Sequence, residues 1–282
     1  MPQKTNLNVS PYYEDFDKAN NFYKVLFKPG YPVQARELTG LQSILQNQIE
    51  NYGSHVFKEG SMVIPGGITV DDGFTTIKVK PDHLGIDVSV YLDALVSGKV
   101  KLKGETSEVV ASIKGYFLPP EEGVEEITLF VKYRDGANDG ETVQFQDGEV
   151  LILQENVSYG NTTLVQEDSV LSLVTTNATA VGYSVGVAKG VYFIRGLFVD
   201  TPDSQIVLDP YNNEPSFRVG FEVIEEVVNS DQDPSINDNA KGFSNYAAPG
   251  ADRLKLSVKL SKKALTDNDD TNFIELVRID EG

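Results

Sequence analysis

The sequence predicts a mainly β protein that begins with an extended arm and one long helix and continues into two antiparallel β regions of barrel or sandwich type. Three observations predict this class. Residues 33–57 have helical periodicity, short apolar runs after residue 58 alternate with turn residues, and the first 32 residues are polar but rich in aromatics. We expect four segments: an arm at 1–32, an oligomerisation helix at 33–57, a small β domain at 58–168, and a second β domain at 169–282 that continues into a longer protein.

The arm holds six aromatic side chains between residues 12 and 27. Exposed aromatic rings are costly in water, so a free tail would not carry so many. We therefore expect the arm to lie across a partner surface or across its own β region. Because interfaces favour aromatic residues, the predicted partner-binding anchors are Tyr12, Tyr13, Phe16 and Phe22. Packing of these rings into the chain's own core is the alternative.

The helix at 33–57 has a narrow apolar stripe whose members recur at spacings of three and four, as in a coiled coil. These residues form the predicted self-association seam: Leu38, Leu41, Leu45, Gln48 and Tyr52. Ile44 and Ile49 flank the seam and widen it towards the three-stranded case, so we expect a homotrimer. The alternative is a single amphipathic helix packed on a sheet, because the seam covers only about two and a half heptads against the roughly three to four typical of coiled coils.

After the helix the apolar period changes to two, which is typical of strands. Two runs around Asp71-Asp72-Gly73 predict a hairpin over 68–79, and residues 87–97 predict one short helix. In the first β region, strands are expected at 100–103, 109–117, 127–133, 142–145 and 150–153. In the second, they are expected at 170–174, 180–187, 191–199, 205–208, 217–226, 254–260 and 273–279.

Composition excludes several classes of function. The net charge is −18, with 42 acidic and 24 basic residues. Such an excess repels phosphate backbones and anionic lipids, so we expect neither nucleic-acid nor membrane binding. The chain has no cysteine, which excludes disulfides, thiolate nucleophiles and cysteine-bound zinc. No apolar run reaches the about 18 residues of a membrane-spanning helix.

No motif for catalysis or cofactor binding is present: the sequence lacks a Gly-x-Ser-x-Gly elbow, a phosphate-binding loop and a dinucleotide fingerprint. We therefore predict no catalytic residues and no cofactor. The loop at 229–250 carries alternating oxygen side chains that are weak calcium candidates, Asp231, Asp233 and Asp238, and a thinner cluster lies at 267–270. Neither has the glycine or closing glutamate of a calcium loop, and acidic turns are usually just solvated, so no metal is predicted.

Two segments resemble a known family. PYYEDFDKANNFYKVLFKPGYPVQARELTGLQSILQNQIENYGSHVFKEGSMVIPGG covers residues 11–67. The second runs from GVYFIRGLFVDTPDSQIVLDPYNNEPSFRVGFEVIEEVV to NYAAPGADRLKLSV and covers most of 190–258. Both are similar to a family of uncharacterised virion structural proteins of contractile-tailed phages, including those of cyanobacteria.

The resemblance implies a tail, baseplate or tail-fibre component that is assembled in the host cytoplasm and acts by binding itself and other tail or baseplate proteins. It implies no catalytic residues. Two other functions stay open from the residues alone. A receptor- or glycan-binding module would use exposed loop aromatics, for which Phe243 and Tyr246 are the candidates. A carbohydrate-active depolymerase would need a facing pair of carboxylates.

Overall fold

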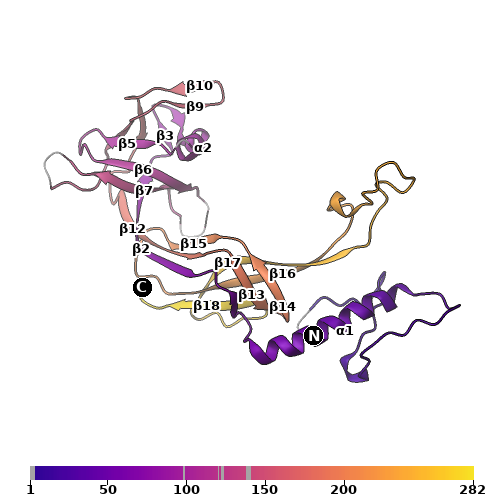
Figure 1. The fold of residues 1–282 in the computed structure, drawn as a ribbon. Coiled ribbons are helices and arrows are strands. Elements are labelled where there is room, and N and C mark those ends of the chain that lie inside the picture. The colour runs from indigo at the N-terminus through magenta and orange to yellow at the C-terminus, as the bar shows by residue number, and fades with distance from the viewer. Residues whose placement is uncertain (1–3, 98, 120, 122–123, 138–140) are drawn as a thin grey trace. The chain divides into compact units, whose positions relative to one another are not determined.

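The computed structural model describes residues 4–97, 99–119, 121, 124–137 and 141–282. Strands make up 41% and helices 14% of it, in several antiparallel sheets and one long helix, with no closed barrel in the described part. The predicted mainly β class is thus confirmed (Figure 1).

The chain forms two compact units, each built from separated stretches of sequence, whereas the prediction had four consecutive segments, at 1–32, 33–57, 58–168 and 169–282. The first, which we call the helix unit, contains the described residues up to Ile68, Gly186–Ser204 and Arg218–Arg278. The second, the sheet unit, contains the described residues of Thr69–Val185, Gln205–Phe217 and Ile279–Gly282.

The helix unit opens with the arm, which includes a short 3-10 helix, η1 (Lys18–Asn20). Helix α1 (Ala35–Val56) follows and confirms the predicted long helix. Its first turn is closed by the backbone N–H of Gln34, which donates to Glu37 Oε2 at 2.8 Å, as in a capping box. Of the helices that the structure describes, none is both long and apolar enough to cross a membrane.

Two three-stranded sheets complete the helix unit. One has the order β1-β13-β14 and the other β17-β16-β18. Their bounds are β1 (Met62–Ile64), β13 (Gly190–Ile194), β14 (Leu197–Thr201), β16 (Phe217–Val228), β17 (Arg253–Ala264) and β18 (Phe273–Ile279), and a 3-10 helix, η3 (Pro234–Ile236), lies between β16 and β17. The single strand predicted at 191–199 is wrong. The chain turns at Arg195-Gly196, where both φ angles are positive, and this closes a tight hairpin.

Helix α1 contacts strand β14, and its buried residues are Ile44, Asn47 and Gly53. Gly53 is needed there because a Cβ would lie 2.8 Å from Cζ of Phe193. The Gln46 side chain adds a hydrogen bond from Nε2 to the Gly196 carbonyl at 3.0 Å. One face of α1 is therefore fixed against its own chain.

The sheet unit is built on an eight-stranded sheet of order β11-β8-β5-β6-β7-β2-β12-β15. Its strands are β2 (Ile68–Val79), β5 (Lys101–Gly104), β6 (Val110–Phe117), β7 (Ile127–Asp135), β8 (Val150–Leu153), β11 (Ser169–Ser172), β12 (Thr179–Val187) and β15 (Ser204–Asp209). Smaller elements are β3 (Asp82–His83), β4 (Ile86–Asp87), η2 (Val88–Val90), α2 (Leu92–Ser97), β9 (Val157–Tyr159) and β10 (Thr162–Leu164). The core is fully buried at positions such as Ile77, Leu92, Leu102, Leu129 and Leu151.

Three predictions for the sheet unit are wrong in detail. The hairpin predicted at 68–79 is instead one continuous strand, β2, which runs through Gly73 without a turn. In the eight-stranded sheet β2 lies between β7 and β12, and its pairing with β7 covers Thr75–Val79. Residues 142–145 form no strand; Phe145 is instead buried against the ring of Tyr133, at 5.2 Å between centroids. The single helix at 87–97 is split into η2 and α2, with Tyr91 between them.

Candidate assembly surface

The face of α1 opposite its own sheet carries a continuous row of exposed apolar side chains. These residues are 46–70% exposed, and we call them the α1 stripe: Leu38, Leu45, Ile49, Tyr52 and Val56. They recur at spacings of seven, four, three and four, so they lie along one side of the helix. Contiguous exposed apolar patches are uncommon on monomers, so this row is the candidate assembly surface of the helix unit.

The α1 stripe is close to the predicted seam but rotated from it. Leu38, Leu45 and Tyr52 belong to both sets. Leu41 is partly buried, and Gln48 is exposed at the edge of the row. Ile49, predicted only to flank the seam, is central. The rotation follows from the side of α1 that packs on its own sheet, which the helical period alone does not specify.

The first part of the arm, residues 4–17, is tied to its own chain, and we call it the anchored segment. The Tyr12 hydroxyl donates to Asp252 Oδ2 at 2.5 Å, and this hydrogen bond raises the pKa of Tyr12. Buried Glu14 accepts a hydrogen bond from the Ser43 hydroxyl of α1. Next to it, Asp15 pairs with Arg36 at 2.7 Å.

A buried ion pair holds the start of the anchored segment. Arg195 Nη1 lies 2.7 Å from Glu225 Oε2, and the two side chains are 7% and 5% exposed. The other Glu225 oxygen accepts the backbone N–H of Thr5 at 2.8 Å, and the backbone N–H of Lys4 donates to Oε2 at 3.2 Å. Burial acts to raise the pKa of Glu225, but the hydrogen bonds from Thr5, Lys4 and Arg195 outweigh it and lower the pKa.

The second part of the arm is different, because its large apolar side chains are not covered. Residues 22–33, which we call the free segment, hold six of them at 50–74% exposure: Phe22, Tyr23, Leu26, Phe27, Tyr31 and Val33. The hydrogen bonds around them are local, such as Tyr31 N–H to the Lys28 carbonyl at 3.3 Å. Figure 1 shows the segment running out past the first turn of α1 and returning to it.

The four predicted arm anchors therefore fall into two groups. Tyr12 and Phe16 are partly buried, and Tyr12 is bonded to its own chain. Tyr13 and Phe22 are 60% and 68% exposed. The prediction missed the aromatic and aliphatic residues at 23–33, although the FYKVLF run was visible in the sequence.

The sheet unit contains a histidine–serine cluster and one hollow that could suggest catalysis. His83, which is buried, has Nδ1 2.9 Å from Ser172 Oγ and Nε2 3.1 Å from Ser169 Oγ. Both ring nitrogens are thus occupied by serines, so neither is left for the orienting carboxylate of a catalytic triad. The cluster joins β3 to β11.

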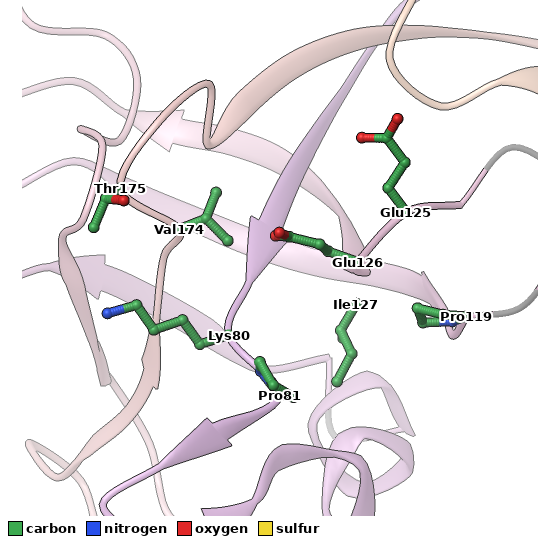
Figure 2. A pocket seen from close by; sticks show the side chains of 8 residues that line it. All are labelled: Lys80, Pro81, Pro119, Glu125, Glu126, Ile127, Val174 and Thr175. Atoms are coloured by element: carbon green, nitrogen blue, oxygen red, sulfur yellow. The ribbon is translucent and has the colours of Figure 1, made fainter.

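The hollow, of about 450 Å³, is lined by Lys80, Glu125, Glu126 and apolar residues (Figure 2). Glu125 pairs with Lys78 at 3.5 Å, and Figure 2 shows its head group pointing away from that of Lys80. Glu125 and Lys80 therefore do not form an acid–base pair in this hollow.

The weak calcium candidates are used in local turns. Asp233 Oδ1 accepts the Ser235 N–H at 2.9 Å, and Asp238 Oδ1 accepts the Ala240 N–H at 2.8 Å. The Asp231 N–H donates to Asn229 Oδ1 at 3.0 Å. Within the described parts of the chain, no group of three or more acidic or histidine side chains is placed to hold a metal ion.

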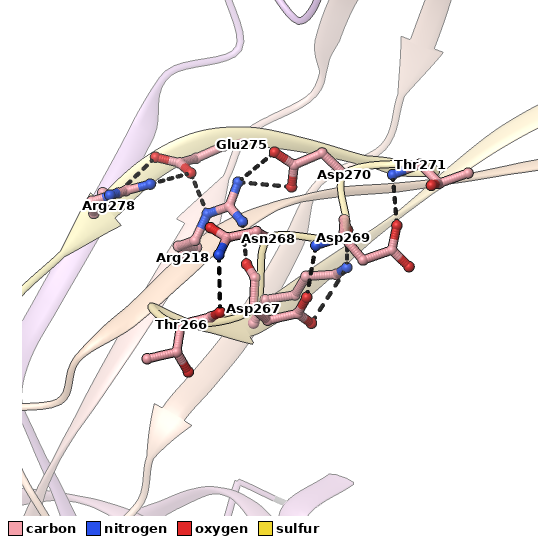
Figure 3. Close-up of polar contacts among 10 residues, drawn as sticks. Arg218, Thr266, Asp267, Asn268, Asp269, Asp270, Thr271, Glu275 and Arg278 are labelled. Atoms are coloured by element: carbon pink, nitrogen blue, oxygen red, sulfur yellow. Dashed lines mark hydrogen bonds and ion pairs between the residues drawn. The ribbon is translucent and has the colours of Figure 1, made fainter.

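The second acidic cluster belongs to an arginine network on the β17-β16-β18 sheet (Figure 3). Buried Arg218 binds both Asp270 oxygens at 2.8 and 3.0 Å, and it also donates to Glu275 and to the Asp267 carbonyl. Arg278 and then Arg218 hold the pKa of Glu275 below its usual range. These carboxylates tie the strand ends together.

The loop between β16 and β17 bears the two aromatics predicted for a glycan-binding function. Phe243 is 75% exposed and Tyr246 is 50% exposed. The loop also contains a polar hollow of about 670 Å³, lined by residues such as Asn237, Asn245 and Arg253.

Comparison with known proteins finds one family. A domain of unknown function, DUF4815, matches residues 10–112 and 172–282. No curated protein and no solved structure gives a significant match. The matched segments include most of the arm, α1 and every strand of the two sheets in the helix unit. Because the match covers well over half of the chain, the protein belongs to the DUF4815 family.

Proposed function

We propose that the protein is a structural component of a phage virion, in the tail, the baseplate or the attachment site of a tail fibre, and acts by protein–protein assembly. The virion assignment rests on the sequence resemblance of residues 11–67 and 190–258. In this proposal copies associate, as a homotrimer, through the α1 stripe, and the arm contacts neighbouring subunits. Closed symmetry lets each copy reuse the same surface.

The observation that carries the proposal is the uncovered apolar surface of the helix unit. The α1 stripe and the free segment together expose eleven large apolar side chains, whereas soluble monomers rarely expose large contiguous apolar patches. The net charge of −18 keeps such a chain soluble before it assembles.

The first test is the solution mass of the chain by light scattering. A trimer of 31.0 kDa subunits is expected, and a Leu45→Asp/Ile49→Asp variant should be monomeric because it places charges in the α1 stripe. The matched control is Asn51→Asp/Ser54→Asp, which adds the same charge at exposed positions of α1 outside the stripe. A monomeric wild type, or equal loss of association in both variants, would refute self-association through this face.

The virion assignment is tested separately. Purified particles of the phage that encodes the chain should contain it, detected by mass spectrometry and located on the tail by antibody labelling. Its presence in the lysate but not in the particles would refute a structural role.

A receptor- or glycan-binding function is the second candidate, favoured by the exposure of Phe243 and Tyr246. It predicts that host surface glycans bind the chain and that Phe243→Ser weakens this binding. Equal binding of both forms, or none, argues against it.

A further inference from the structure

Two apolar surfaces of the helix unit remain uncovered in one chain: the α1 stripe and the free segment at 22–33. A direct contact between α1 helices would cover the first and leave the six side chains of the second in water. One contact that joins the free segment to the α1 stripe of another copy would cover both.

We infer that the occupant of the α1 stripe is the free segment of a neighbouring copy of this chain, so that each subunit gives one arm and receives one. The inference rests on the proposed self-association and specifies which surfaces meet. It replaces a direct seam between α1 helices with an exchange of arms.

The dimensions of the two surfaces agree. Residues 22–28, before the Pro29-Gly30 turn, span about 23 Å when extended, at about 3.3 Å per residue. The α1 stripe from Leu38 to Val56 spans about 27 Å, at 1.5 Å per residue. Gly30, at φ +82°, then allows the chain to turn back towards the start of its own helix.

The area is also that of a stable interface. Four aromatic rings, each able to bury about 150–250 Å², are half to three quarters exposed in the free segment and offer on the order of 500 Å². Leu26 and Val33 bring the segment towards the about 800 Å² that one partner contributes to a standard interface.

Charge favours the same contact. Residues 18–33 contain Lys18, Lys24 and Lys28 and no acidic residue. In a chain with a net charge of −18, this is a basic segment that a second copy attracts, while the rest of the two chains repel each other.

The anchors make an exchange geometrically simple. The free segment leaves and rejoins its own subunit at one place, because Asp15 is paired with Arg36 in the first turn of α1 and residue 34 precedes that turn. The segment can therefore reach outwards while the helix unit keeps its fold. A head-to-tail contact of this kind gives the proposed trimer when the rotation between successive copies closes after three of them.

The absence of cysteine from the sequence provides a direct test. Leu26→Cys and Leu45→Cys are made as separate variants, mixed in equal amounts and oxidised mildly, and the disulfide-linked dimers are separated by intact mass. We expect the 26–45 heterodimer to exceed either homodimer by at least about tenfold, because the contact raises the effective concentration of the two thiols. Ser54→Cys, exposed outside the stripe, replaces Leu45→Cys as the matched control and should crosslink far less.

Each other outcome overturns the inference in a distinguishable way. A dominant 45–45 homodimer means that α1 helices meet directly, which leaves the proposed self-association intact. A chain carrying both cysteines that closes internally at high dilution means that the arm covers its own helix. A wild-type chain that is monomeric by light scattering and forms no preferred crosslink refutes both the exchange and the self-association.

Discussion

Replacing Glu225 with glutamine tests whether the buried ion pair holds the start of the arm. Among the described residues, Glu225 is the only carboxylate paired with the Arg195 guanidinium, and it also accepts the backbone N–H groups of Thr5 and Lys4. Glutamine has nearly the same shape but no charge, and its amide nitrogen cannot accept a hydrogen bond. The substitution therefore leaves the Arg195 guanidinium buried without a counterion.

Breaking one partner of a buried ion pair costs about 3–5 kcal/mol. That loss raises the unfolding equilibrium constant by about a hundredfold or more. We expect Glu225→Gln to lose about this much stability in urea unfolding at pH 7, followed by far-UV circular dichroism. Release of Thr5 and Lys4 should also speed proteolytic cleavage in the arm.

The next residue in the chain supplies the matched control. Glu226 pairs with Lys255 at 3.1 Å, but the two side chains are 45% and 58% exposed. Exposed pairs are worth about 0–1 kcal/mol, so Glu226→Gln should change stability little. If the two variants lie within about 1 kcal/mol of each other, the Arg195–Glu225 pair does not stabilise the helix unit as argued.

Three further outcomes are expected. Gly53→Ala should destabilise the helix unit, although alanine has the better helix propensity, because the added methyl group meets the Phe193 ring. The midpoint of thermal unfolding should be lower for Gly53→Ala than for the control Gly40→Ala, whose Cβ has no atom within 4 Å. Buried Glu149 accepts hydrogen bonds from the Ser107 hydroxyl and from the backbone N–H groups of Thr106, Ser107 and Gln146. Glu149→Ala leaves these donors unpaired and should cost about 3 kcal/mol or more in urea unfolding. Folding lowers the pKa values of Glu225 and Glu275, so both carboxylates stabilise the folded chain above about pH 4.5, and this stabilisation is lost as the pH falls through their folded pKa values. The urea midpoint should therefore decline from pH 7 to pH 3. The decline should be less steep in Glu275→Gln, which lacks one of the two titrating groups.

The long helix could be predicted because its signals are local. The 3.5-residue period of its apolar stripe is read from neighbouring positions in the sequence. The rotation of the helix could not be predicted, because it depends on Gly53 fitting the Phe193 ring, far away in the sequence. The sequence identifies an apolar row but not which side of it the chain's own sheet occupies.

The errors in the strands have a similar origin. Asp71-Asp72-Gly73 has the composition of a hairpin turn, but strand β2 continues through it and lies between β7 and β12 in the sheet. The Arg195-Gly196 turn lacks the asparagine or aspartate that usually marks a tight hairpin. In each case tertiary contacts override a weak local preference.

The division of the arm was the least predictable feature, and it bears most directly on function. Its anchors join residues more than 200 positions apart, such as Thr5 with Glu225 and Tyr12 with Asp252. Ordering a residue costs about 1–2 kcal/mol of conformational entropy. Because the anchored segment is already bonded to its own chain, the proposed association would restrict only the free segment, and the apolar area of that segment is available to offset the cost. An arm fixed at both ends of its exposed part is thus better suited to assembly than a free tail of equal composition.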